Sequence, residues 1–97
     1  MEYKISRYPN GNIQEEEYYE NGKFHREDGP AYILYWANGN IQYETYYIDD
    51  KLHREDGPAR IAYSPEGNIL FQEHWKNGAY IQVEIVKTII ITDDYSI

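Results

Sequence analysis

The sequence lacks several features that would indicate particular classes of protein. It contains no cysteine, which excludes disulfides and thiolate metal sites and fits a reducing compartment, so we expect a cytoplasmic location. The first residues, Met1 to Lys4, include no apolar segment, so we expect no signal peptide. No run approaches the ~18 apolar residues that a membrane helix needs, and we expect no membrane contact.

Positive charge is also scarce. Nine basic residues stand against 17 acidic ones, which gives a net charge of −8. A protein that binds the phosphate backbone needs a basic surface, so direct nucleic-acid binding is not expected. An acidic surface favours basic partners instead. The pattern Gly-x-Gly does not occur, which argues against a glycine-rich phosphate loop.

A seven-residue stretch, His-Arg-Glu-Asp-Gly-Pro-Ala, dominates the organisation of the chain. It occurs at 25–31 and again, unchanged, at 53–59, which is 28 positions later. Further columns share this period, because Gly-Asn-Ile recurs at 11–13, 39–41 and 67–69. An internal repeat of this kind indicates stacked structural units that bury their apolar faces against each other. We therefore predict one repeat domain over 1–97, with units at about 3–30, 31–58 and 59–78 and a C-terminal cap at 79–92.

The segments between the turns are short and rich in β-formers. Runs of about six residues are too short for helices and are typical of strands. We predict strands at 3–8, 13–19, 32–36, 41–47, 60–63 and 69–75, and one long or two short strands within 80–92. The fold class is therefore all-β, with antiparallel β-hairpin repeats forming an elongated twisted sheet that ends in a capping strand. We expect tyrosines and isoleucines to line one face.

Asn-Gly pairs predict tight hairpin turns. Pro9-Asn10-Gly11-Asn12 is interpreted as a type I′ turn, which requires positive φ at both central residues. Asn21-Gly22 and Asn77-Gly78 predict further turns, and Asp49-Asp50 takes the same place in the second unit.

These motifs resemble those of a known repeat family. Tandem hairpins with Asn-Gly-Asn-Ile, Tyr-Tyr-x-Asn-Gly-Lys and Gly-Pro-Ala are similar to MORN-like repeats, and to the variant that carries the His-Arg-Glu-Asp-Gly-Pro-Ala signature. This variant occurs in bacterial, phage and large-virus proteins, including ones described as antitoxin-component-like. The resemblance covers residues 3–78 and departs from the common MORN unit in its longer period. It implies an elongated sheet and a scaffolding or binding role without a cofactor, in the host cytoplasm if the protein is viral.

The repeated stretch has a structural interpretation. Its glycine supplies a backbone position that other residues tolerate poorly, its proline starts the next strand, and its aspartate bonds its own loop. The arginine pairs with a carboxylate, and the histidine packs on a neighbouring tyrosine. Two copies between three units match the number of interfaces that such a device would serve.

A functional interpretation of the same stretch remains open. His25, Arg26, His53 and Arg54 would form two equivalent sites, because arginine binds carboxylate and phosphate in a bidentate way. The acidic residues that follow each pair would oppose an anion. No nucleophile accompanies these groups, so we expect no catalytic residues and no enzyme activity. A metal site from His25, His53 and His74 is not expected, because His74 shares the column of two tyrosines rather than that of the other histidines.

Two other surfaces are candidate contacts. The acidic strip of Glu15, Glu16, Glu17 and Glu20 is either a surface for a basic protein or a solvated face of the terminal unit. The isoleucine-rich C-terminal segment is either a cap or an exposed edge that pairs with another chain. We therefore predict a possible homodimer through 80–91, with Ile85, Ile89 and Ile91 as its oligomerisation residues.

Two classes of function follow from the sequence. The first is a non-enzymatic protein–protein interaction module, in a narrower form a phage inhibitor that occupies the basic nucleic-acid groove of a host defence enzyme. The second is a small-anion or nucleotide-binding sponge that uses the repeated His-Arg loops.

Overall fold

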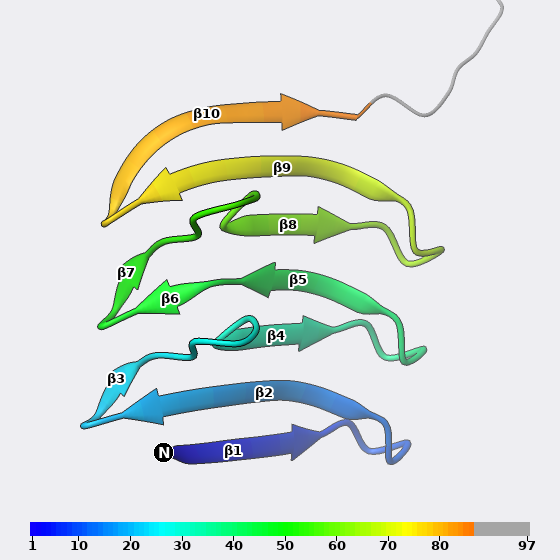
Figure 1. Cartoon of the computed structure of the whole chain (residues 1–97). Helices are drawn as coiled ribbons and strands as arrows, with labels where there is room; N and C mark the ends of the chain where they lie inside the picture. The colour runs from blue at the N-terminus through cyan, green and yellow to red at the C-terminus, as the bar shows by residue number, and fades with distance from the viewer. Residues whose placement is uncertain (87–97) are drawn as a thin grey trace, which may run out of the picture.

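The computed structural model describes residues 1–86, and these form an open, all-β antiparallel sheet (Figure 1). The prediction of fold class is confirmed. The main sheet has the strand order β1-β2-β4-β5-β8-β9-β10, β3 extends it beside β2, and β6 pairs with β7 in a separate two-stranded sheet. The strands are β1 (Glu2–Arg7), β2 (Ile13–Glu20), β3 (Lys23–Phe24), β4 (Tyr32–Tyr35), β5 (Ile41–Thr45), β6 (Tyr47–Ile48), β7 (Lys51–Leu52), β8 (Arg60–Tyr63), β9 (Ile69–Lys76) and β10 (Ala79–Ile85). Within this part of the chain, no helix is long and apolar enough to cross a membrane.

The register of the strands follows the 28-residue period. The chain forms three hairpins, β1–β2, β4–β5 and β8–β9. In each of them the same two positions of the repeat pair with each other, namely Lys4 with Glu17, Tyr32 with Thr45, and Arg60 with Glu73. Adjacent hairpins then join through β2–β4 and β5–β8, where Glu16 pairs with Ile33 and Glu44 pairs with Ile61. The second strand of each hairpin therefore pairs with the first strand of the next hairpin, and the repeats form one sheet.

The hairpin turns are of two kinds, and the type I′ prediction for Pro9-Asn10-Gly11-Asn12 is wrong. Gly11 has φ of +93° but Asn10 has no positive φ, and the N–H of Gly11 donates to Tyr8 O at 2.9 Å. The same geometry recurs at 36–39, where alanine takes the place of Pro9: Gly39 has φ of +98° and its N–H donates to Trp36 O at 3.0 Å. The turn therefore does not depend on the proline. Pro9 suits the second position of the observed turn, which begins at Tyr8, because its ring fixes φ near −65°. The geometry is that of a turn that ends in a left-handed glycine, and the strand register shifts beside it.

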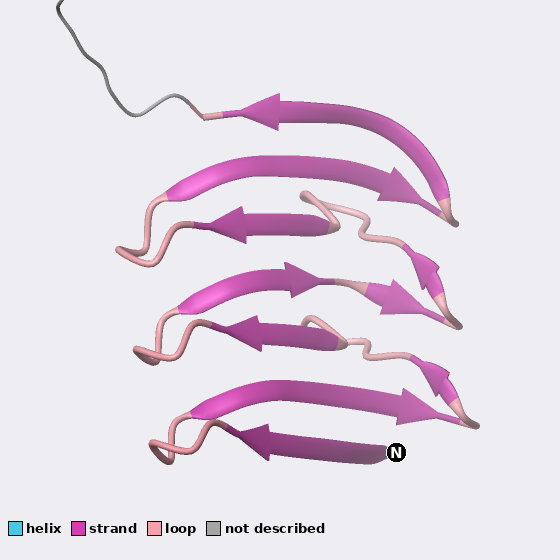
Figure 2. Cartoon of the chain, turned by 180° about the vertical axis from the view of Figure 1, so that it is seen from behind, coloured by secondary structure: helices cyan, strands magenta, loops and turns pink. Residues whose placement is uncertain are grey.

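The turns at the opposite end of the hairpins do have paired positive φ values. Asn21 and Gly22 have φ of +52° and +77°, and Asp49 and Asp50 have φ of +49° and +66°. The first of these turns joins β2 to the two-residue strand β3, and the second joins the two-residue strands β6 and β7 (Figure 2). Asparagine, aspartate and glycine are the residues that adopt this conformation most readily, which explains why aspartate replaces Asn-Gly in the second unit.

Tyrosines occupy both faces of the sheet, so the expectation that tyrosines and isoleucines line one face is wrong. Directly opposed residues of a ladder share a face, which places Ile33 and Ile61 with Glu16 and puts Tyr32 on the other side. Tyr18 lies on the isoleucine face, because its hydroxyl donates to Glu16. The open sheet buries few residues fully: the buried hydrophobic ones are Ala31, Ile33, Ala59, Ile61 and Ala62.

The third unit ends differently from the first two. After β3 and β7 the chain leaves the sheet through His-Arg-Glu-Asp-Gly-Pro-Ala, whereas after Asn77-Gly78 it continues as β10 along β9. β10 thus occupies on β9 the place that β4 occupies on β2 and β8 on β5. The predicted capping strand is present as far as Ile85, and the predicted residues 87–92, including Ile89 and Ile91, lie outside the described residues.

Candidate functional site

The two repeated loops, 25–31 and 53–59, are held by contacts that recur with the repeat. The N–H of His25 donates to Tyr18 O at 3.1 Å, and its Nδ1 accepts the N–H of Asp49 in the next hairpin at 3.1 Å. The Nδ1 of His53 accepts the N–H of Asn77 in the same way, at 3.0 Å. Each histidine therefore fastens its own unit to the turn of the following one.

The other ring nitrogen of each histidine faces a carboxylate from its own loop. His25 Nε2 lies 2.8 Å from Glu27, and His53 Nε2 lies 2.9 Å from Glu55. His25 is only 8% exposed. Its hydrogen bond with Glu27 raises the pKa of His25 above the ordinary 6.5, with burial opposing and the charges of Asp49, Glu27 and Glu20 adding to the rise.

The arginines are bound within the repeat stack. Arg26 Cζ lies 4.0 Å above the ring centroid of Tyr18, and its Nη1 donates to Pro30 O at 3.2 Å. Arg54 repeats this geometry, at 4.1 Å above Tyr46 and 3.1 Å from Pro58 O. Both guanidinium groups thus combine a cation–π contact with a charge-assisted hydrogen bond. Each also forms an ion pair with the aspartate of its own loop, because Arg26 Nε lies 3.2 Å from Asp28 and Arg54 Nε lies 3.9 Å from Asp56.

The glycine of each loop makes room for the arginine. A Cβ at Gly29 would lie 3.1 Å from Arg26 Cζ, and one at Gly57 would lie 3.0 Å from Arg54 Cζ. Neither glycine has a left-handed φ. The glycine at this position is therefore explained by close approach of the guanidinium group rather than by backbone conformation.

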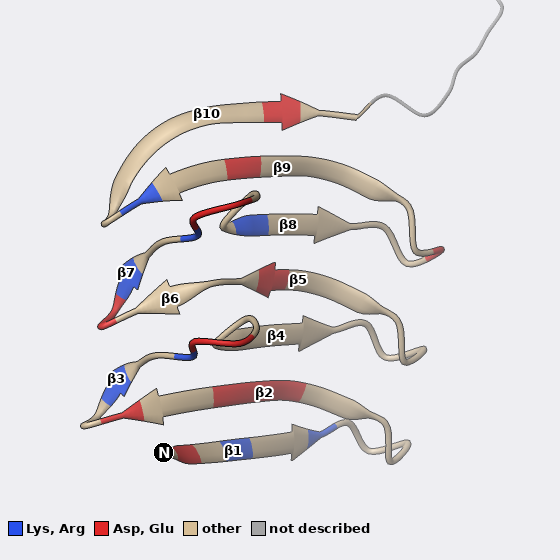
Figure 3. Ribbon diagram, in the orientation of Figure 1, with Lys and Arg blue, Asp and Glu red and all other residues tan. Residues whose placement is uncertain are grey.

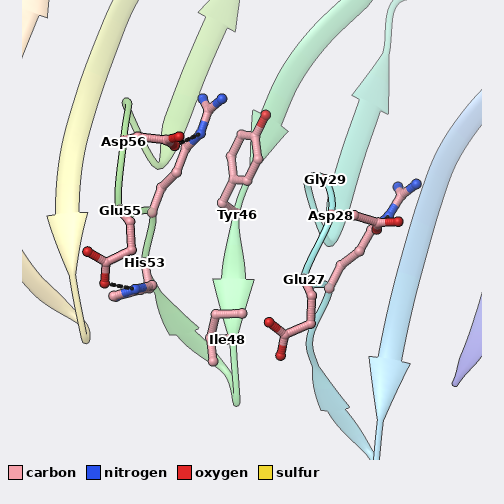
Figure 4. Close-up of a pocket in the computed structure, with 10 residues that line it drawn as sticks. Glu27, Asp28, Gly29, Tyr46, Ile48, His53, Glu55 and Asp56 are labelled. Carbon is pink, nitrogen blue, oxygen red and sulfur yellow. Dashed lines mark hydrogen bonds and ion pairs between the residues drawn. The ribbon is translucent and has the colours of Figure 1, made fainter.

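An open hollow of about 450 Å³ lies between the two loops. Figure 4 shows Glu27 and Asp28 on one side of it, Glu55 and Asp56 on the other, and Tyr46 between them. The four carboxylate side chains are 73–92% exposed, whereas the arginine side chains are only 25% and 29% exposed. The charge that the hollow presents to solvent is therefore mainly negative.

The acidic strip of β2 is divided between the two faces of the sheet. Glu15 accepts the hydroxyl of Tyr32 at 2.6 Å, and Glu17 accepts that of Tyr19 at 2.8 Å. Glu16 lies on the opposite face and accepts Tyr18 at 2.7 Å. These three glutamates are half-buried and serve as internal acceptors, while Glu20 is exposed and lies 3.6 Å from His25 Nε2.

The tyrosines that pair with these glutamates have perturbed acidity. Burial and the hydrogen bond to Glu17 raise the pKa of Tyr19 to about 12. Burial, followed by the hydrogen bond to Glu15, raises the pKa of Tyr32 as well. A neutral phenol is favoured in both cases, because it donates to the carboxylate while the phenolate would be repelled by it.

The remaining candidates are separate from the loops. Ile85 lies on β10 and is 70% exposed. His74 lies on β9 with Nε2 at 3.3 Å from Glu84, and thus takes no part in the contacts of His25 and His53. Among residues 1–86, no group of three or more histidine, cysteine, aspartate or glutamate side chains is arranged to hold a metal ion.

Sequence reasoning did not identify the aromatic partners of the arginines. A signal was present, because two positions of the repeat change together. The first two units have Tyr18 with Arg26 and Tyr46 with Arg54, whereas the third unit has His74 with Gln82. The unit that loses the arginine also loses the tyrosine. Ile48, which lines the hollow between the loops, was missed as well.

Comparison with known proteins finds a similarity in the first two units. A family model described as a MORN repeat variant matches residues 5–21 and 31–49, which lie in the first two units. No curated protein and no solved structure matches. MORN repeats commonly serve as non-catalytic modules that bind other proteins. The first two units are therefore similar to MORN repeats, which fits a non-enzymatic interaction role.

Proposed function

We propose that this chain is a non-enzymatic protein–protein interaction module that presents the carboxylates of its two repeated loops to a basic surface of a partner. One observation carries the proposal. In each loop the guanidinium group is largely covered by its own unit, while the aspartate that pairs with it keeps most of its surface exposed around the hollow: Asp28 is 86% and Asp56 92% exposed. Rim charges of this kind favour fast, salt-sensitive association with an oppositely charged surface.

The composition of the whole chain also supports binding to a basic partner. The net charge of −8 favours basic partners, and Tyr46 beside the carboxylates adds a residue type that is enriched at interfaces. In a narrower form of the proposal, the protein is a phage inhibitor that acts in the host cytoplasm. There it would cover the basic nucleic-acid groove of a defence enzyme. The resemblance to the signature-bearing MORN-like variant and the acidic charge support this form.

The alternative function, a sponge for a small anion, receives less support from the geometry. An anion at Arg26 or Arg54 would have to compete with a tyrosine face and a proline carbonyl. It would also approach carboxylates that are more exposed than the guanidinium groups. A basic protein segment meets neither obstacle.

Affinity capture with charge-matched variants tests the proposal. The tagged chain is compared with Asp28→Asn/Asp56→Asn and with a control, Glu2→Gln/Glu66→Gln, which removes two exposed carboxylates elsewhere. We expect one discrete protein to be captured from the source cells by the unmodified chain and by the control, with capture falling as salt rises. The loop variant should lose it while its thermal unfolding stays unchanged.

Two outcomes would contradict the proposal. Equal capture by the loop variant would remove the loops from the interface. A bound small molecule in native mass spectrometry, with no captured protein and with loss of the extra mass in Arg26→Ala/Arg54→Ala, would establish the sponge instead.

A further inference from the structure

The two edges of the main sheet differ in how they are protected. β1 forms one edge and carries Glu2, Lys4 and Arg7 among its six residues, whereas the seven residues of β10 include one charge, Glu84 (Figure 3). Charged side chains, lysine above all, are a common means of preventing edge-to-edge association. β10 lacks that protection.

β10 also exposes the groups that strand pairing uses. The N–H of Val86 donates to Leu70 O on β9 at 2.9 Å. Because backbone groups alternate along a strand, those of Val83 and Ile85 point away from β9. Their side chains are 42% and 70% exposed, and that of Ile81 is 52% exposed. Among residues 1–86, the edge therefore offers both backbone groups without a partner and apolar surface.

The sequence of β10 is complementary to itself. Residues 81–85 read Ile-Gln-Val-Glu-Ile, which is symmetrical in chemical type about Val83. In an antiparallel pair centred on Val83, each Ile81 faces an Ile85 and each Gln82 faces a Glu84. The amide of Gln82 is a donor and the carboxylate of Glu84, at 53% side-chain exposure, is an acceptor. Within the chain, Gln82 pairs with His74 and Glu84 pairs with Gln72 on β9, so Gln82 and Glu84 lie on the same face of the sheet.

We propose that two copies of this chain associate through β10, antiparallel, about a two-fold axis that passes through Val83 perpendicular to the sheet. Such an axis keeps the two faces of the sheet continuous across the interface. The interface is isologous, because both copies contribute the same strand, so association through this edge stops at two copies. A shift that places Glu84 on the axis would oppose two like charges, which is unfavourable in a directly opposed pair.

The mass of the intact chain in solution is the first test. Light scattering should give twice the 11.6 kDa of one chain at micromolar concentration or above, and Val83→Lys should give the mass of one chain. A matched control, Ile5→Lys on the β1 edge, should leave the dimer intact. A monomeric unmodified chain, or dissociation by the β1 variant alone, would overturn the proposal.

Charge substitutions at position 82 test the register. Gln82→Lys places a cation opposite Glu84 and should tighten the dimer, whereas Gln82→Glu opposes two carboxylates and should weaken it. With two such pairs in the interface, each change should alter Kd by about two- to thirtyfold, in opposite directions. Changes of the same sign would exclude the pairing of Gln82 with Glu84.

The absence of natural cysteine allows a second test of the register. Val83→Cys should form an intermolecular disulfide under mild oxidation, because two residues on the axis lie about 5.5 Å apart between Cα atoms. Ile85→Cys is equally outward-facing but lies about 13 Å from its copy in this register, and should not cross-link. Cross-linking at Ile85 instead of Val83 would refute the stated axis.

Discussion

Replacement of Gly57 by alanine should destabilise the protein only when Arg54 is present. The new Cβ would lie 3.0 Å from both Arg54 Cζ and Nη1, so the guanidinium group must shift by a few tenths of an ångström from its place over Tyr46. The shift weakens a cation–π contact of about 0.5–1 kcal/mol and a charge-assisted hydrogen bond to Pro58 O of about 1.5–3 kcal/mol, both already reduced by the 29% exposure of the side chain. The lower flexibility of the unfolded chain offsets about 0.4–1 kcal/mol.

The net loss should therefore be at most about 1–2 kcal/mol, which corresponds to a fall in Tm of at most roughly 4–16 °C for a domain of this size. In an Arg54→Ala background the same glycine substitution meets no guanidinium group, and its φ lies outside the left-handed region. Only the effect on the unfolded chain remains there. Gly57→Ala should then stabilise the protein by about 0.4–1 kcal/mol.

Urea unfolding of the four proteins in this double-mutant cycle measures the change of sign. Gly67→Ala is the matched control, because Gly67 has φ of +97° and no atom lies within 4 Å of the place that a Cβ would take. That substitution strains the backbone alone and should destabilise both backgrounds equally. An effect of Gly57→Ala that is the same in both backgrounds would refute the role assigned to the guanidinium contact.

Three further predictions follow from single contacts. The imidazole of His25 should titrate above 6.5 by NMR, and Glu27→Gln should lower that pKa. Because the folded-state pKa is raised, the stability that this pair contributes is complete below 6.5 and is lost as pH rises through the folded pKa, so Glu27→Gln should destabilise least at alkaline pH. The phenol of Tyr19 should ionise near pH 12 in ultraviolet titration, and Glu17→Gln should lower its pKa; an ionisation near 10 would contradict the burial and hydrogen bonding described. Ala59→Val should cost about 1–3 kcal/mol in urea unfolding, because Ala59 is 0% exposed and its N–H and C=O join two hairpins; a neutral result would show that the site can expand.

Much of the fold could be predicted because the same pattern of turns and strands recurs in three units. The Asn-Gly turns and the short alternating runs locate the main strands, and the 28-residue period aligns them. The two-residue strands β3 and β7 were missed, because segments of that length carry no periodicity. The turn at Pro9 was assigned the wrong type because Asn10 and Gly11 were taken as its central pair, whereas the N–H of Gly11 closes a turn that begins at Tyr8.

The candidate site was less predictable because its contacts are long-range. The bond from the N–H of Asp49 to His25 joins residues 24 positions apart, and the register between hairpins decides which groups meet. The inward direction of Arg26 and the outward direction of Asp28 follow from the path of the loop rather than from the order of residues. Repeats do offer a substitute for an alignment, since the joint change of Tyr46 and Arg54 to His74 and Gln82 reports a contact.

The most direct measurement compares two pairs of substitutions within the repeated loops, where each arginine holds its loop against the hairpin of its own unit while the aspartates face outward. Urea unfolding of Arg26→Ala/Arg54→Ala should show a loss of about 3–6 kcal/mol from two cation–π contacts and two charge-assisted hydrogen bonds, reduced for the 25% and 29% exposure of the side chains. Asp28→Asn/Asp56→Asn should change the free energy of unfolding by less than about 1 kcal/mol, as expected of exposed ion pairs. An arginine variant that is as stable as the unmodified protein would contradict this division of roles.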